Sequence, residues 1–272
     1  MKKLYLLLTM LSLVSLVGCS KTNVEETSNI ISINDGESVT IDIDGDKEDD
    51  LVTFGYLDIE DGYIGNYAVN VNGDEYVLEA CGPRDTMHLV KADANKNEYL
   101  IVLGEDGPSC DYASYLLRYK DHSFIELGSV GGVIDNDFEY SDSLVFNFDG
   151  TLTAPVRADI VQTWFYNANY EIKDDKLVKE EKDFYDVDYD TELLVDFEFY
   201  KEPNENSEKT LVRSETVMKF IGLDDEKWTK VSYIDLYGEE AVAYFPVYYF
   251  GYMDEEMEVM DTDVFKNLCM AD

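Results

Sequence analysis

Alternating acidic residues fill one short stretch of the chain, residues 41–54, which reads IDIDGDKEDDLVTF. Four of them fall at positions 1, 3, 5 and 9 of a loop pattern: Asp42, Asp44, Asp46 and Asp50. Gly45 allows a tight turn among them, and the backbone carbonyl of Glu48, at position 7, can supply one more oxygen. Such a set of hard oxygen ligands suits Ca²⁺, whereas Mg²⁺ keeps several waters. The spacing therefore predicts a structural calcium site.

The residues around this loop decide which kind of calcium loop it is. An EF-hand needs a bidentate Glu at position 12 between two helices, but Thr53 stands there and the flanking residues are β-type. The loop resembles the calcium loop of FG-GAP repeats (integrin-type, also called VCBS), and Phe54-Gly55 also fits that pattern. The resemblance implies a loop that joins two strands of a β-propeller blade. The alternative interpretation is a solvated acidic turn that holds no ion.

Two later segments repeat the pattern in weaker form. The first carries fewer charges and is predicted as a weak second loop: Asp93, Asn95 and Asn97. The second keeps the spacing but lacks the glycine: Asp135, Asp137 and Glu139. Both are expected to persist as turns rather than as ion sites. If the resemblance holds, these repeats belong to an incomplete or small β-propeller-like domain.

The N-terminus predicts export and lipid anchoring. Lys2 and Lys3 precede an apolar run at residues 4–17 that is too short to span a membrane comfortably. The run ends in Leu16-Val17-Gly18-Cys19, which resembles a bacterial lipobox. The resemblance implies cleavage before Cys19, lipidation of that residue, and attachment to the outer face of the bacterial cell membrane. The alternative is an ordinary signal peptide in which Cys19 is incidental.

The charge of the chain restricts its partners. Its 59 Asp and Glu residues outnumber 21 Lys and Arg residues, which gives a formal net charge of −38. Such a surface repels nucleic acid and anionic headgroups and attracts cations or basic partners. Nucleic-acid binding is therefore excluded as a function. The alternative role of the acidity is simply to keep an exported protein soluble.

Short apolar runs bounded by Gly, Asn and Asp predict an all-β fold. Hairpin turns are expected at residues 71–74, 148–151 and 173–176. The one convincing helical segment covers residues 261–270, where apolar residues recur at helical spacing. A polar break at residues 200–208 fits either a domain linker or a long hairpin loop. The predicted division is a signal peptide (1–18), a tether (19–30), a propeller-like β domain (31–191) and a C-terminal module (192–272).

The C-terminal module resembles a bacterial SH3-like barrel. The resemblance rests on a turn followed by Trp228 and Val231, with Gly238 before an aromatic and apolar segment. It implies binding of cell-wall peptides or glycans, although Glu239 and Glu240 stand where the family has a tryptophan. Three aromatic residues are candidates for facing such a ligand: Trp228, Tyr248 and Tyr249. Burial of these rings in a β core is the simpler alternative.

The remaining sequence offers little for catalysis. The chain has two histidines and lacks the Gly-x-Ser-x-Gly and His-Glu-x-x-His motifs. Three cysteines remain besides Cys19, and a Cys81–Cys110 disulfide and small buried thiols are both open interpretations. We therefore expect a non-catalytic, calcium-stabilised surface protein that binds an envelope protein or glycan. The alternatives are a wall-associated structural protein without a specific ligand and a carboxylate-based glycoside hydrolase.

Overall fold

The chain folds into antiparallel β-sheets. The computed structural model describes residues 28–60, 64–107, 111–134, 143–158, 164–246 and 261–268. These residues carry nineteen strands and one four-residue helix, α1 (Asp261–Val264), so the all-β prediction is confirmed. The helix is shorter than predicted because Phe265 already bridges to Leu193. No helix in the described ranges is long and apolar enough to cross a membrane.

The first sheet is a four-stranded meander. Its strands pair in chain order: β2 (Ser38–Ile41), β3 (Asp50–Glu60), β4 (Ile64–Val71) and β5 (Asp74–Cys81). Alternate residues of β4 face the core, where Tyr67, Val69 and Val71 are fully buried, as the two-residue period of a strand requires. Asn72 and Gly73 join β4 to β5 with positive φ at both positions, which confirms the predicted hairpin.

A second meander follows, and the first strand of the described chain joins it. Its strands are β6 (Pro83–Val90), β7 (Leu100–Asp106), β8 (Tyr112–Lys120) and β9 (Ser123–Gly131). Strand β1 (Ile30–Asn34) pairs antiparallel with the outer edge of β6, with Ile30 opposite Val90. The described part of the chain therefore enters the second sheet at β1 and crosses to the first at β2. This crossing ties the two sheets together.

The third meander repeats the order of the first two. It consists of β10 (Val145–Phe146), β11 (Thr151–Ala158), β12 (Trp164–Lys173) and β13 (Lys176–Lys179). Asp174 and Asp175 form the β12–β13 turn with positive φ at both residues, so this predicted hairpin is confirmed as well. The predicted turn at residues 148–151 lies between β10 and β11.

The fourth sheet has six strands. In spatial order they are β14 (Tyr185–Glu192), β17 (Val217–Leu223), β18 (Trp228–Ile234), β19 (Glu240–Pro246), β15 (Phe197–Tyr200) and β16 (Lys209–Val212). Residues 201–208 connect β15 to β16, and the Lys201 N–H donates to the Glu208 carbonyl. The polar break is thus a hairpin loop rather than a linker. Because β14 pairs with β17, this sheet begins before the predicted boundary at residue 192.

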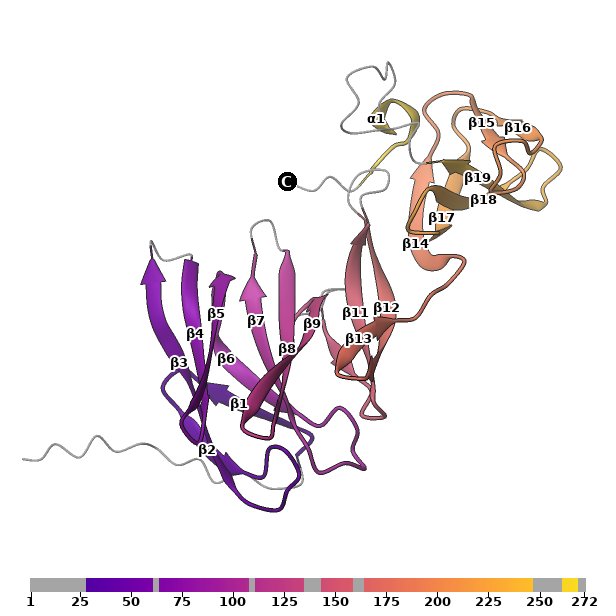
Figure 1. The fold of residues 1–272 in the computed structure, drawn as a ribbon. Helices are drawn as coiled ribbons and strands as arrows, with labels where there is room; N and C mark the ends of the chain where they lie inside the picture. The colour runs from indigo at the N-terminus through magenta and orange to yellow at the C-terminus, as the bar shows by residue number, and fades with distance from the viewer. Residues whose placement is uncertain are drawn as a thin grey trace, which may run out of the picture.

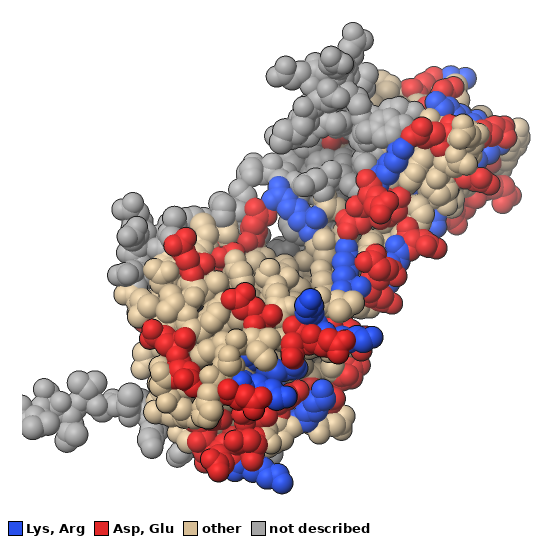
Figure 2. Space-filling model, viewed as in Figure 1, with Lys and Arg blue, Asp and Glu red and all other residues tan. Residues whose placement is uncertain are grey.

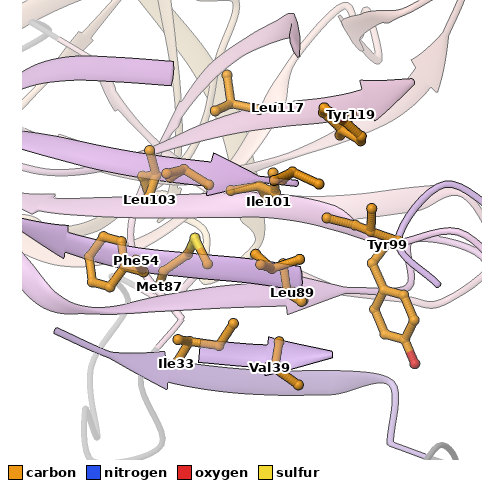
Figure 3. Close-up of a cluster of buried hydrophobic side chains, with 14 of the residues drawn as sticks. Ile33, Val39, Phe54, Met87, Leu89, Tyr99, Ile101, Leu103, Leu117 and Tyr119 are labelled. Atoms are coloured by element: carbon orange, nitrogen blue, oxygen red, sulfur yellow. The ribbon is translucent and has the colours of Figure 1, made fainter. Parts of the chain in front are cut away.

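The four sheets follow one another in series (Figure 1), and three apolar clusters join them. The first cluster lies between the first two meanders, and Figure 3 shows Phe54, Met87 and Leu103 within it. The second joins the second and third meanders, where β9 contacts β11 and β13. The third extends from β12 into the fourth sheet and includes Phe265 beside α1. None of the four sheets closes on itself.

We predict that Phe245→Ala removes the centre of the third cluster. The Phe245 ring is fully buried against Phe199, Phe220 and Phe265, and such truncations cost about 3–5 kcal/mol. Urea unfolding followed by tryptophan fluorescence, to which the buried Trp228 contributes, should show the loss. Leu236→Ala, at a side chain that is 90% exposed, is the matched control and should change stability by less than about 0.5 kcal/mol. An unchanged unfolding midpoint in Phe245→Ala would contradict the assignment.

Candidate cation site in the first acidic loop

The loop between β2 and β3, residues 42–49, coils through its own aspartate side chains. Oδ1 of Asp42 accepts the Gly45 N–H at 2.8 Å, and Oδ1 of Asp44 accepts the Asp46 N–H at 3.1 Å. Oδ1 of Asp46 accepts the Glu48 N–H at 2.7 Å. Each aspartate thus forms a local turn that lets the next one follow at a spacing of two residues. Gly45 has a φ of 83°, the left-handed region that glycine adopts most readily.

Three of the predicted ligands converge. One carboxylate oxygen from each of Asp42, Asp44 and Asp50 lies within 4.8 Å of the other two. Asp50, only 9% exposed at the start of β3, accepts the Ile43 N–H at 3.1 Å on one oxygen. The Asp46 carboxylate, the fourth predicted aspartate ligand, is not part of this group, and the Glu48 backbone carbonyl stays a prediction. Three close oxygens of one charge are a geometry that a hard divalent cation can fill.

Two asparagines complete the surroundings of the aspartates, and sequence reasoning did not assign either to this loop. The Asn72 amide donates to Oδ1 of Asp50 at 2.6 Å, and its own oxygen accepts the Leu51 N–H. The Asn97 amide donates to Oδ2 of Asp42 at 3.0 Å. Asn72 was visible as part of a hairpin turn and Asn97 as part of a second loop. Strand pairing within the first meander brings Asn72 to Asp50, and the packing of the second meander against the first brings Asn97 to Asp42.

The loop is also joined to the second meander through its backbone. The Tyr99 N–H donates to the Ile43 carbonyl at 2.8 Å. A Cβ atom placed on Gly45 would lie 2.9 Å from the Asn97 carbonyl oxygen, which is closer than side chains tolerate. Gly45 is therefore required both for its φ and for the close approach of the second loop.

The predicted second loop, residues 91–99, does not gather its polar residues around one centre. Asn95 donates twice to Oδ1 of Asp93, at 2.9 and 3.0 Å, while Asn97 points to Asp42 instead. Asp93 bridges to Asp149 in the β10–β11 connection. That connection, residues 147–150, occupies the position in the third meander that the acidic loop has in the first. The predicted third copy at Asp135, Asp137 and Glu139 lies outside the described residues.

Crowding and burial perturb the acidic group. The pKa of Asp44 is raised above its ordinary value of 3.8, chiefly by burial and then by the charges of Asp46, Asp50 and Asp42, against a backbone hydrogen bond that lowers it. Nearby, the Tyr119 hydroxyl donates to Asp74 at 2.6 Å. Burial and this carboxylate raise the pKa of Tyr119, with smaller contributions from Asp50 and Asp44. Neighbouring carboxylates therefore raise the pKa of both groups.

The other predicted site residues are placed as follows. Trp228 is 8% exposed and packs edge-on against Tyr200 at 5.4 Å, so it is a core residue rather than a ligand platform. Cys81 is a half-buried free thiol. Cys19, Cys110, Tyr248 and Tyr249 lie outside the described residues.

We predict that Gly45→Ala destabilises the junction between the first two meanders. Gly36→Ala is the matched control, because Gly36 has a similar φ of 77° but nothing near its Cβ position. Both variants carry the backbone strain of a left-handed alanine, about 1–2 kcal/mol. Gly45→Ala should lose roughly a further 1–3 kcal/mol through the clash with the Asn97 carbonyl. Equal losses in urea unfolding would rule out the close approach.

We also predict that, in the presence of a chelator, ionised Asp44 lowers the stability of the fold in a pH-dependent way. Because the folded-state pKa of Asp44 is raised, protonated Asp44 stabilises the folded protein relative to the unfolded one. This stabilisation is present at low pH and is lost as the pH rises through the folded-state pKa. At neutral pH without metal, Asp44→Asn should therefore be more stable than the wild type. The gap should narrow as the pH falls toward the raised pKa. Thermal unfolding of both proteins across this range measures it, and a gap independent of pH would contradict the assignment.

Comparison with known proteins does not assign the chain to a family. No protein-family model, curated protein or solved structure matches the chain. The FG-GAP and SH3-like resemblances therefore remain predictions from the sequence motifs. The interpretation of the acidic loop rests on the convergence of Asp42, Asp44 and Asp50 and on the contacts that hold them.

Proposed function

We propose that this protein is a non-catalytic, calcium-stabilised surface protein, anchored through a lipid on Cys19 to the outer face of the bacterial cell membrane. In this role it binds a protein or glycan of the envelope. The observation that carries the calcium assignment is the convergence of Asp42, Asp44 and Asp50 in a loop bonded to the next meander. The anchoring assignment rests on the lipobox-like residues that end at Cys19.

A cation in this loop would act structurally. Asp42 accepts a hydrogen bond from Asn97 of the second meander, and Asp50 begins β3 of the first. Neutralising their mutual repulsion would therefore stabilise the loop and the junction that it makes. Extracellular calcium sites bind at about 10⁻⁴–10⁻³ M, which suits an exported protein in a calcium-containing medium.

The order of the strands supports the proposal of a propeller-like domain followed by an SH3-like module. Three successive four-stranded meanders, each with a polar connection between its first and second strands, have the order expected of propeller blades. We assign them as an incomplete propeller. We assign the six-stranded sheet that follows as the SH3-like module.

The turn that precedes Trp228 in this resemblance is the β17–β18 turn. Within it, Oδ1 of Asp224 accepts the N–H groups of Glu226, Lys227 and Trp228.

The surface charge fits a binding role outside the cell. On the face in Figure 2, acidic side chains spread over both ends of the molecule, with basic ones interspersed. Many of the cations pair with neighbouring acids, as Arg157 does with Asp111 and Lys219 with Asp188. The surface as a whole therefore disfavours polyanions such as nucleic acid.

We predict that Ca²⁺ binds the wild-type chain and raises its melting temperature. Isothermal titration and thermal unfolding in calcium and in chelator measure the two effects. Asp44→Asn and Asp50→Asn should lose both, because each removes one charged ligand. In chelator, Asp44→Asn should have a higher melting temperature than the wild type. When calcium is added, the wild type should have the higher melting temperature.

Asp174→Asn is the matched control, since Asp174 lies in the β12–β13 turn, outside the acidic loop, and asparagine tolerates its φ of 51°. It should bind and respond like the wild type. A wild-type chain that gives no binding heat and no thermal shift in millimolar calcium would refute the calcium assignment.

A further inference from the structure

The fourth sheet exposes an apolar surface around one groove. The groove lies between β16 and the β18–β19 hairpin and has a volume of about 490 Å³. Its lining includes large apolar side chains that face solvent: Leu211, Ile234, Leu236, Tyr237 and Val242, with exposed fractions of 49, 61, 90, 90 and 43%. Single exposed apolar residues are common, but a cluster of them around a hollow marks an interaction site.

The groove adjoins a free strand edge. Strand β19 pairs with β18 along its full length, from Glu240 to Pro246. On its other side the ladder with β15 consists of the single pair Tyr200–Tyr244. Within the described chain, residues 240–243 of β19 therefore lack a strand partner on that side. Ala241 and Val242 belong to this free stretch and also line the groove.

This combination specifies the chemistry of an occupant. The backbone N–H and C=O groups of a free strand edge are satisfied by another extended polypeptide backbone. The apolar lining next to the edge offers places for alternate side chains of such a strand. A glycan could stack on the exposed Tyr237 ring, but it would leave the edge unpaired. The groove therefore favours an extended peptide.

The charged residues of the groove restrict this peptide further. Lys201 and Arg213 line it against the single acid Asp235, although acids greatly outnumber cations in the whole chain. Their pairs with Glu208, at 3.0 Å, and with Asp196, at 2.6 Å, are solvent-exposed. Exposed pairs contribute little stability, so a carboxylate of the incoming peptide can share these cations. The groove is complementary to apolar residues combined with acidic ones.

We propose that this groove binds an extended, apolar and acidic segment of a partner protein, which adds as a strand to residues 240–243 of β19. The inference rests on the proposed binding function and deepens it by naming the surface and the class of partner. It does not depend on calcium, because none of the groove residues belongs to the acidic loop.

The probe is a phage-displayed library of random peptides, selected against the purified full chain. Enriched peptides should alternate apolar with other residues and carry acidic side chains. Binding of a fluorescein-labelled peptide from this set is then measured by anisotropy. Ile234→Asp and Val242→Asp should each weaken it by about tenfold or more, because each places a charge in the apolar lining. Arg213→Ala should weaken acidic peptides selectively.

Val178→Asp is the matched control, at a side chain of β13 that is 46% exposed and outside the groove. It should bind like the wild type, and circular dichroism checks the folding of all variants. Hydrogen exchange supplies a readout of strand addition, since the bound peptide should slow exchange at residues 240–243.

The outcomes separate this inference from the wider proposal. Peptides that bind equally well to both groove variants, or that protect another segment, overturn the groove and leave a binding role intact. A glycan whose binding both variants abolish, with no peptide enriched, overturns the peptide assignment. Failure to enrich any peptide also overturns it. Failure of the calcium titration alone leaves the groove inference standing.

Discussion

Repulsion among Asp42, Asp44 and Asp50 is the constraint on which the junction of the first two meanders depends. Three carboxylates stay within 4.8 Å of one another because backbone and asparagine N–H groups hold them there. Burial adds to the cost, as the raised pKa of Asp44 indicates. The cation that we propose for this loop would offset the repulsion and stabilise the junction.

The same loop shows how the meanders are joined in series. Its Ile43 carbonyl accepts the Tyr99 N–H of the second connection, and residues 92 and 94 of that connection bond to residues 150 and 148 of the third. Polar connections therefore link each meander to the next at this edge, while apolar clusters join the sheets between them. Backbone hydrogen bonds set the relative position of the meanders, and burial supplies most of the favourable free energy.

The fourth sheet is organised differently. Its core gathers aromatic rings, including Phe199, Phe220, Phe245 and Phe265, and buries Trp228 beside Tyr200. Apolar side chains nevertheless remain exposed at the end of the β18–β19 hairpin, next to a strand edge with an incomplete ladder. Leu236 and Tyr237 remain in solvent, and they belong to the surface on which we propose that a partner segment binds.

The sequence by itself determined the local features: the all-β class, the hairpin at Asn72-Gly73, and an acidic loop whose coil follows from aspartates two residues apart. These depend on interactions between near neighbours, which alternation and turn residues record. Tertiary structure decided that Asn97 serves Asp42 rather than a second site, that Trp228 is buried, and that β14 belongs to the fourth sheet. It also decided that the turn predicted at residues 148–151 bonds to the connection of the second meander. Such outcomes depend on pairing between distant segments, and that pairing leaves no periodic signal in the chain.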